Sequence, residues 1–392
     1  FDESLLKASV NNYKLSMEKA MEENSSRADF YVNSFINGTE WADEVSVLDR
    51  MSKLTKEDIV ALANKYLGME NYVVVYKREG KDPNEKKIAK PVITPIKMNR
   101  DTASVFLNQV TASVVEPIEP VFVDYKKDMA VLEAQSGIEV LYKQNTTNHL
   151  FELNYIFDMG EYQDKALGLA GQYLEFLGTK DMTSEEIQRS FYEMACGFSV
   201  SPGSERTYIR LTGLQENMPK AVALLEKLLA EAQVNDEAYQ NLVSNELKAR
   251  QDAKLSQSEN FKRVRAYAQY GPKNPFTNIL SEKELKGMNP QELVDRIHGL
   301  TSYKHRVLYY GPASEEELIA LLKGEHKVPE TLKELPVVEE MAYQETPKTR
   351  IFVAPYVAQQ VYVSQFSNRK EAYDATLVPQ INLYNEYFNG NM

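Results

Sequence analysis

The sequence repeats itself, and this limits the possible folds more than any other feature. The matched segments are Val73–Tyr76 with Val307–Tyr310 and Leu54–Val60 with Met288–Val294 at a shift of 234 positions, and Tyr384–Phe388 with Tyr173–Leu177 at a shift of 211 positions. Repetition of this kind indicates one supersecondary unit used more than once. The order of the matches predicts a partial unit, a whole unit and a second partial unit.

Two proline-rich stretches divide the chain. Five of the sixteen prolines fall between Pro83 and Pro120, a stretch that also carries Lys81, Lys86, Lys87 and Lys90, and a second group runs from Pro329 to Pro347. Proline removes a backbone donor and favours extended geometry in the residue before it, so both stretches are predicted to be mostly irregular connectors. The predicted layout is a partial unit at 1–80, a linker at 81–120, a whole unit at 121–325, a linker at 326–346 and a partial unit at 347–392.

Hydrophobic periodicity predicts an α+β fold. The first block is expected to contain three helices, the last of them capped by Thr55 and Asp58, and then a strand at 72–76. The middle block is expected to have strands at 138–142, 151–157, 207–211 and 306–310, and helices at 164–177, after Thr183, over 217–268, at 290–299 and after Ser314. The last block is expected to have strands at 350–353 and 360–366 before a helix that ends near Gly390.

Composition excludes several functions. A formal net charge of -12 repels phosphate backbones, which argues against a nucleic-acid partner. No apolar run approaches the roughly 20 residues of a membrane-spanning helix, so no membrane partner is expected. The single cysteine, Cys196, cannot form an internal disulfide and is predicted to pack in a core. One cysteine does not distinguish cytoplasm from periplasm, so the compartment stays open.

Other chemistry finds little support in the sequence. The four histidines, His149, His298, His305 and His326, have no metal-ligand spacing and are expected to lie at the surface or at helix ends. No glycine-rich phosphate loop is present. The glutamates at 185–186 and 315–317 open predicted helices, where the backbone dipole favours negative charge, so they are expected to stabilise those helices.

One stretch, Gly168–Thr179, carries a resemblance to a known family. It is similar to the motif helix of the insulinase/pitrilysin-type zinc peptidases, whose H-x-x-E-H motif supplies two zinc ligands and a glutamate that activates water. Further similar segments are Asn24–Arg27, Gly38–Trp41, Tyr310–Pro312 and Asn389–Met392. The resemblance implies duplicated α/β-roll units, each an antiparallel sheet packed with helices. This chain would then hold the tail of a second unit, a whole third unit and the head of a fourth.

The resemblance also implies which residues stand at the motif positions. Gln172 and Phe176 occupy the two histidine positions, Glu175 the general-base position, Glu246 that of a supporting glutamate and Ala253 that of the zinc-binding glutamate. Phenylalanine and alanine cannot bind zinc, and an amide is a weak ligand. No catalytic residue, no metal site and no cofactor are therefore expected in this chain. Zinc is expected in an absent catalytic unit.

Two functions follow from this resemblance. The first is the non-catalytic, substrate-enclosing portion of a zinc metalloendopeptidase that degrades peptides, inactive alone and partnered by a missing N-terminal catalytic half. The alternative is a catalytically dead scaffold, or the partner subunit of a heterodimeric peptidase or other assembly. A third interpretation is an unrelated α+β binding protein.

The ends of the chain and its partial units add two expectations. The chain begins with Phe1 and has no initiator methionine, which is expected of a fragment. The two partial units are expected to expose apolar edges and to pair with each other, within one chain or between chains.

Overall fold

The structure is a computed structural model that describes residues 3–68, 70–81, 88–96, 98, 102–338 and 341–390. The chain forms two compact units, one made of residues 1–53 and 129–392 and the other of residues 54–128. Pro83, Lys86 and Lys87 of the first predicted linker lie outside the described residues. So do Asn391 and Met392 of the predicted glycine-rich end.

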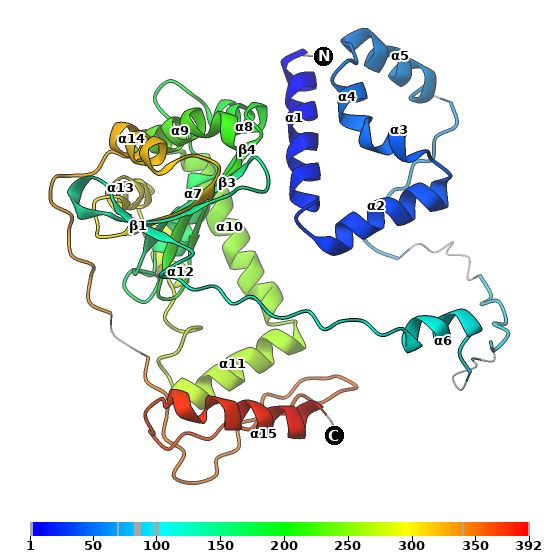
Figure 1. Cartoon of the computed structure of the whole chain (residues 1–392). Helices are drawn as coiled ribbons and strands as arrows, with labels where there is room; N and C mark the ends of the chain where they lie inside the picture. Colours follow the sequence, from blue (N-terminus) through cyan, green and yellow to red (C-terminus); the bar gives the residue numbers. More distant parts are fainter. Residues whose placement is uncertain are drawn as a thin grey trace. The chain divides into compact units, whose positions relative to one another are not determined.

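A six-stranded mixed sheet forms the centre of the larger unit (Figure 1). Its strands are β1 (Ala130–Glu133), β2 (Glu139–Gln144), β3 (Leu150–Phe157), β4 (Cys196–Pro202), β5 (Thr207–Leu214) and β6 (Arg306–Gly311). They lie in the order β1-β2-β6-β3-β5-β4. The β2–β6 pair is parallel and all other pairs are antiparallel. The last strand in sequence, β6, therefore lies between the second and third.

Helices cover this sheet and complete its core. They are α7 (Leu167–Leu174), α8 (Ser184–Glu193), α9 (Met218–Glu231), α10 (Asp236–Ala253), α11 (Gln257–Tyr270), α12 (Glu282–Gly287), α13 (Gln291–Leu300) and α14 (Glu315–Glu325), with 3₁₀ turns η1 (Gln135–Gly137) and η2 (Gln215–Asn217). Apolar residues of β2, β3, β5 and β6 pack with those of α7, α9, α13 and α14 in one buried cluster. Val307 and Tyr309 of β6 are fully buried in it. Burial of apolar area on this scale is the main stabilising contribution to such a unit.

The helix-start predictions are confirmed. Thr55, Thr183 and Ser314 each accept a hydrogen bond from the backbone N–H three residues later, and the acidic side chain there bonds back to the cap. These reciprocal bonds satisfy N–H groups that a helix N-terminus leaves unpaired. The predicted strands at 138–142, 151–157, 207–211 and 306–310 are confirmed as β2, β3, β5 and β6. All of these features are local, which is why the sequence shows them.

Two strands of the sheet were missed. The outer strand β4 carries Phe198 and Val200 between small polar residues, a two-residue alternation that could have indicated it. Strand β1 is only four residues long and has no comparable signal. Cys196 begins β4 and is buried, as predicted, and its burial raises the pKa of the thiol to about 12.

Three predicted strands are wrong. Residues 72–76, 350–353 and 360–366 run without helix or strand structure and pair with no strand in the described part of the chain. A β-rich sequence becomes a strand only when another strand satisfies its backbone groups. The chain described before residue 72 is helical apart from turns, and 350–353 and 360–366 do not pair with each other.

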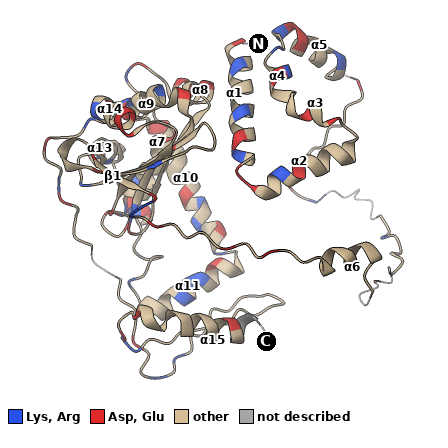
Figure 2. Cartoon of the chain, viewed as in Figure 1, with Lys and Arg blue, Asp and Glu red and all other residues tan. Residues whose placement is uncertain are grey.

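The larger unit also contains the first helices of the chain. These are α1 (Glu3–Ala20), α2 (Asn24–Asn37), α3 (Trp41–Val45) and α4 (Val47–Met51). The side chain of Asn12 donates to the carbonyl of Tyr192 at the end of α8 (2.7 Å), and Glu18 accepts from the backbone of His149 (3.0 Å). Acidic and basic side chains alternate over α1, α10 and α11 (Figure 2).

The smaller unit is mainly extended chain with two helices, α5 (Lys56–Tyr66) and α6 (Val105–Ala112). Helix α6 lies in the stretch predicted to be an irregular linker, and Ser104 caps it. No helix in the described parts of the chain is long and apolar enough to cross a membrane.

The helix bounds agree with the predicted repeat. Shifted by 234 positions, α10, α11 and α13 coincide with α1, α2 and α5 to within one residue at each end. Shifted by 211 positions, the first residue of α7 falls on the first residue of α15 (Val378–Gly390), which follows the 3₁₀ turn η3 (Ala375–Leu377). Four helices of the middle block thus recur in residues 1–80 and 347–392, and the described residues of those two stretches contain no strand.

Candidate functional site

The motif residues named from the sequence lie at the end of helix α7. Gln172 is the only one of the three inside the helix, and its side chain is exposed. Glu175 caps the C-terminus of the helix, and Phe176 follows it with 49% of its surface exposed. These side chains face solvent, whereas Leu169 and Tyr173 of the same helix are buried.

The two downstream positions lie further along α10. The Tyr173 hydroxyl donates to the carbonyl of Asn235 (2.8 Å), so α7 meets α10 near its start. Ala253 is the last residue of α10, roughly 25 Å along the axis from its first at about 1.5 Å per residue. The structure therefore does not bring Ala253 together with Gln172 and Phe176.

Glu246 forms part of a polar contact beside α7. Its carboxylate pairs with Arg250 one turn later (2.7 Å). Burial, followed by the negative charge of Glu246, raises the pKa of Glu161, whose carboxyl group lies against the backbone of Gly168. This places two carboxyl groups near the start of α7, away from the motif positions at its end.

The residues at the motif positions do not fit a zinc ion. Their side chains supply one amide at Gln172 and no donor at Phe176 or Ala253, whereas zinc sites use imidazole, thiolate or carboxylate ligands. Among the residues that the structure describes, no three His, Cys, Asp or Glu side chains could hold a metal ion together. We derive no zinc-dependent step from this chain.

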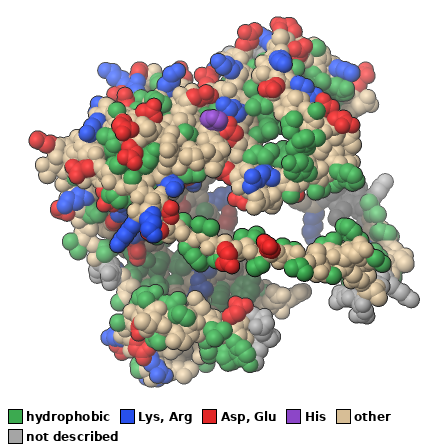
Figure 3. Space-filling view, in the orientation of Figure 1, with side chains coloured by type: hydrophobic (Ala, Val, Ile, Leu, Met, Phe, Trp, Pro, Cys, Tyr) green, Lys and Arg blue, Asp and Glu red, His purple; other side chains and the backbone are tan. Residues whose placement is uncertain are grey.

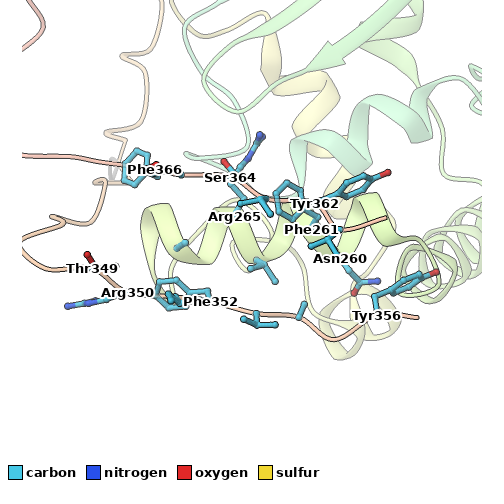
Figure 4. Close-up of a pocket in the computed structure, with 18 of the residues that line it drawn as sticks. Asn260, Phe261, Arg265, Thr349, Arg350, Phe352, Tyr356, Tyr362, Ser364 and Phe366 are labelled. Carbon is cyan, nitrogen blue, oxygen red and sulfur yellow. The ribbon is translucent and has the colours of Figure 1, made fainter. Parts of the chain in front are cut away.

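A groove of about 960 Å³ runs along helix α11 (Figure 4). One face of the helix, including Asn260, Phe261 and Arg265, forms its floor. The extended segments 349–356 and 360–367 form its sides.

Aromatic side chains attach the two segments to α11. The ring of Phe352 meets that of Tyr267 edge to face at 5.7 Å, and the ring of Tyr362 meets that of Phe261 in the same way at 5.5 Å. The side chain of Gln257 donates to the carbonyl of residue 360 (2.6 Å). Such contacts hold the segments extended without using their backbone hydrogen-bonding groups for a sheet.

The groove is basic. Arg265, Lys348 and Arg350 line it, and the acidic residue Glu345 in its lining is paired with Lys370. Extended backbone, aromatic rings and basic side chains together suit a peptide that adds as a strand and carries acidic groups. Nothing in the sequence patterns singled out this groove, because its floor and sides are far apart in the chain.

The histidine prediction is only half right. His149 is exposed beside Glu18, and His298 Nε2 donates to the carbonyl of Ala232 (3.1 Å), as expected of surface and helix-end residues. His326 is instead fully buried, and the ring of His305 packs on that of Phe157 at 4.8 Å. Burial lowers the pKa of His305 to about 4. No sequence pattern indicates this pair, because the two residues are 21 positions apart and contact each other through tertiary packing.

Comparison with known proteins finds similar solved structures. No family model and no curated protein matches the sequence. The structure is similar to peptidases of the M16 (pitrilysin/insulinase) type. An inactive M16 peptidase domain from Pseudomonas fluorescens aligns with a TM-score of 0.47 and 16% identity, over 55% of this chain and 54% of that chain.

Two longer proteases align over more of this chain. The periplasmic protease PqqL from Escherichia coli aligns with a TM-score of 0.49 and 13% identity, over 87% of this chain and 42% of its own. The ferredoxin protease FusC, in complex with Arabidopsis ferredoxin, aligns with a TM-score of 0.48 and 12% identity, over 82% of this chain and 38% of its own. The chain therefore spans about half or less of the proteins that it resembles.

Proposed function

We propose that this chain is a non-catalytic part of a zinc metallopeptidase and that it helps to enclose and hold peptide substrates. The zinc chemistry would come from a catalytic half outside this chain. The observation that carries the proposal is the groove along α11, with two extended segments whose backbone groups no strand pairs. Non-ligand side chains at Gln172, Phe176 and Ala253 support the non-catalytic role.

An extended peptide would bind by strand addition. Its backbone would pair with segment 350–353 or 360–366, and its side chains would contact Phe352 and Tyr362. Backbone pairing tolerates many sequences, which suits a protein that encloses varied peptides. Arg265 and Arg350 would favour peptides that are acidic or end in a free carboxylate.

Peptide titration tests the strand-addition step. We expect a fluorescent, acidic, extended peptide to bind the full chain and the same peptide with alternate N-methylated amides to bind at least tenfold more weakly, because N-methylation removes backbone donors. Phe352→Ser should weaken binding by about tenfold, whereas Phe106→Ser, on exposed α6, should not change it. Equal binding of the two peptides would contradict strand addition.

Zinc analysis and cleavage assays test the non-catalytic role. The purified chain is expected to hold no stoichiometric zinc and to leave a quenched peptide uncut when zinc is added. Glu175→Gln should change neither result. Chelator-sensitive cleavage by the native chain that Glu175→Gln abolishes would overturn the proposal.

An assembly role is the second candidate, and exposed apolar side chains favour it. Tyr31, Phe35 and Ile36 of α2 are 61%, 88% and 71% exposed, and Figure 3 shows apolar side chains gathered over α2 and α3. Apolar patches of this kind mark surfaces that another protein or another copy covers. Light scattering of the full chain tests self-association: a mass that rises with concentration and falls in Phe35→Asp would support it, and a monomer at all concentrations would contradict it.

A further inference from the structure

Three titratable side chains meet in the core of the whole unit, away from the groove. Glu226 of α9 and His326, at the C-terminal end of α14, are buried, and His305 precedes β6. His326 Nδ1 lies 2.8 Å from Glu226 Oε1, and His326 Nε2 lies 2.9 Å from His305 Nε2. His305 Nδ1 lies 2.7 Å from the carbonyl oxygen of Tyr303. Each imidazole nitrogen therefore has one partner.

These contacts fix the number of hydrogens in the cluster. A carbonyl oxygen only accepts, so His305 Nδ1 carries a hydrogen. One more hydrogen lies between His326 Nδ1 and Glu226, on either atom. A third must lie between the two Nε2 atoms, because two lone pairs would otherwise face each other at 2.9 Å. With three hydrogens the cluster has no net charge, either as imidazolium and carboxylate or as two neutral rings and a carboxylic acid.

The apolar surroundings make any other number of hydrogens in the cluster energetically costly. The ring of Tyr155 lies 4.3 Å from that of His326, and the buried Tyr155 hydroxyl faces the carboxyl group of Glu226. Burial and then the charge of Glu226 raise the pKa of Tyr155 well above its ordinary value, so this residue stays neutral. An uncompensated charge in such an apolar site is costly. The flanking charged residues are paired with one another, Arg306 with Asp158 and Lys304 with Glu334.

A metal ion between the two imidazoles fits the distance less well. Zinc lies about 2.0–2.1 Å from each histidine nitrogen, which puts two tetrahedral ligand nitrogens roughly 3.3 Å apart. The observed 2.9 Å between His305 and His326 is a hydrogen-bond distance.

The cluster lies where the chain leaves the whole unit. His326 begins a segment, 326–333, that is hydrogen-bonded to η1 and to the loop before β6. The bonds are Gln135 Nε2 to the carbonyl of His326 (2.6 Å), Ser136 Oγ to that of Pro329 (2.7 Å), the N–H of Lys333 to the carbonyl of Ser302 (2.8 Å) and the N–H of Lys304 to that of Lys333 (2.9 Å). The buried imidazoles hold both sides of this attachment.

We propose that Glu226, His326 and His305 form a proton-dependent latch that holds residues 326–333 against the whole unit and opens when the shared proton is lost. Without that proton, either the two Nε2 lone pairs repel or a buried carboxylate has no positive partner. Opening lets water reach all three groups. The free chain that follows α14 becomes longer, which loosens the connection to the last partial unit.

Proton linkage determines whether the latch opens more or less as the pH rises. Above the ordinary histidine pKa of about 6.5, an opened cluster holds two hydrogens, one on each ring, and the closed cluster holds three. Opening therefore releases one proton, and its equilibrium constant rises about tenfold per pH unit. Below pH 6.5 the opened histidines bind further protons, so the latch is most stable near that pH.

Hydrogen exchange of the full chain between pH 6.5 and 8.5 tests the latch. After correction for the intrinsic exchange rate, opening at the Lys333 amide is expected to increase about tenfold per pH unit. In His305→Gln the amide N–H can donate to His326 Nε2 without an extra proton, so protection should persist and its pH dependence should disappear. His149→Gln, a change at an exposed imidazole, should behave as the native chain does.

Two results would overturn the proposal. One is pH-independent opening at Lys333 in the native chain, and the other is an unchanged pH slope in His305→Gln. If His305→Gln does not fold, nitrogen NMR of the native chain at pH 7 replaces it. A hydrogen that couples the two Nε2 atoms supports the latch, and its absence contradicts it.

Discussion

Residues 54–76 match residues 288–310 in their helix and apolar pattern, but the two stretches differ in burial. Leu293 and Leu300 of α13 are 0% and 4% exposed, while Tyr66, which matches Leu300 in α5, is 66% exposed. The strands differ more. Val307 of β6 is fully buried, and its counterpart Val73 is 89% exposed. An apolar pattern therefore permits burial, and only a sheet to pack against produces it.

Residues 347–392 show the same difference in burial when they are compared with their counterparts 211 positions earlier. Val140 of β2 is fully buried, and Ile351, 211 positions later, is 84% exposed. Tyr173 of α7 is fully buried, and its counterpart Tyr384 in α15 is 62% exposed. In the larger unit, β6 pairs with both β2 and β3, whereas no strand in the described residues lies beside 350–353 or 360–366. These two β-rich segments therefore stay unpaired.

The largest expected effect comes from truncating a matched pair of strand residues. Tyr309→Ala removes a fully buried ring whose hydroxyl donates to Gln215 Oε1 (2.9 Å) and accepts from the N–H of Ala313 (2.9 Å). Loss of a buried aromatic side chain should lower the free energy of unfolding by about 3–5 kcal/mol. Urea unfolding followed by circular dichroism measures it.

The counterpart of Tyr309 in the first partial unit provides the control. Val75 is 87% exposed, so Val75→Ala should change the free energy of unfolding by less than about 0.5 kcal/mol. Comparable losses at the two positions would mean that the partial unit is packed like the whole one.

Acid should destabilise the larger unit, which contains all four histidines, through His305. Burial lowers the pKa of His305 to about 4, so the unfolded chain binds a proton near pH 6.5 that the folded chain refuses. The stability that His305 contributes is then fully present at pH 6.5 and falls by about 3 kcal/mol as the pH drops to about 4.

Urea unfolding at a series of pH values measures this loss. At each pH, the unfolding midpoint of His305→Gln is subtracted from that of the native chain. The same difference for His149→Gln should be near zero, because that imidazole is exposed. A native chain whose stability between pH 6.5 and 4 matches that of His305→Gln would show that His305 protonates without penalty.

The smallest expected effect concerns the helix caps, which the whole and partial units share. Ser314→Ala removes the cap of α14 and should lower the stability of the whole unit by about 1 kcal/mol. Thr55→Ala removes the same kind of cap from α5 and should increase amide exchange in that helix without moving the unfolding midpoint of the whole unit. A shift of that midpoint in Thr55→Ala would indicate that α5 unfolds together with the sheet.

Much of the secondary structure could be read from the sequence because its causes are local. The caps at Thr183 and Ser314, and the alternation in β3, depend on neighbouring residues. The strand errors have one cause. Segments 72–76 and 350–353 have strand composition, but pairing depends on partners that no local pattern reveals.

The candidate site was much harder to predict. The motif residues Gln172, Glu175 and Phe176 could be named, but their placement at an exposed helix end, away from Ala253, required the structure. The groove joins α11 to segments about ninety residues later in the chain. The buried contact between His305 and His326 likewise depends on how α14 packs beside β6.

The sequence by itself determined the repeat, the helices with their caps and the residue types at the motif positions, because these depend on spacing and chemistry along the chain. Tertiary structure decided which of the matched segments pair in a sheet, where the open groove lies and which histidines contact each other. Burial, strand pairing and contact between distant side chains are properties of the packed chain, and the same apolar pattern gave a core in one copy and an exposed surface in the others.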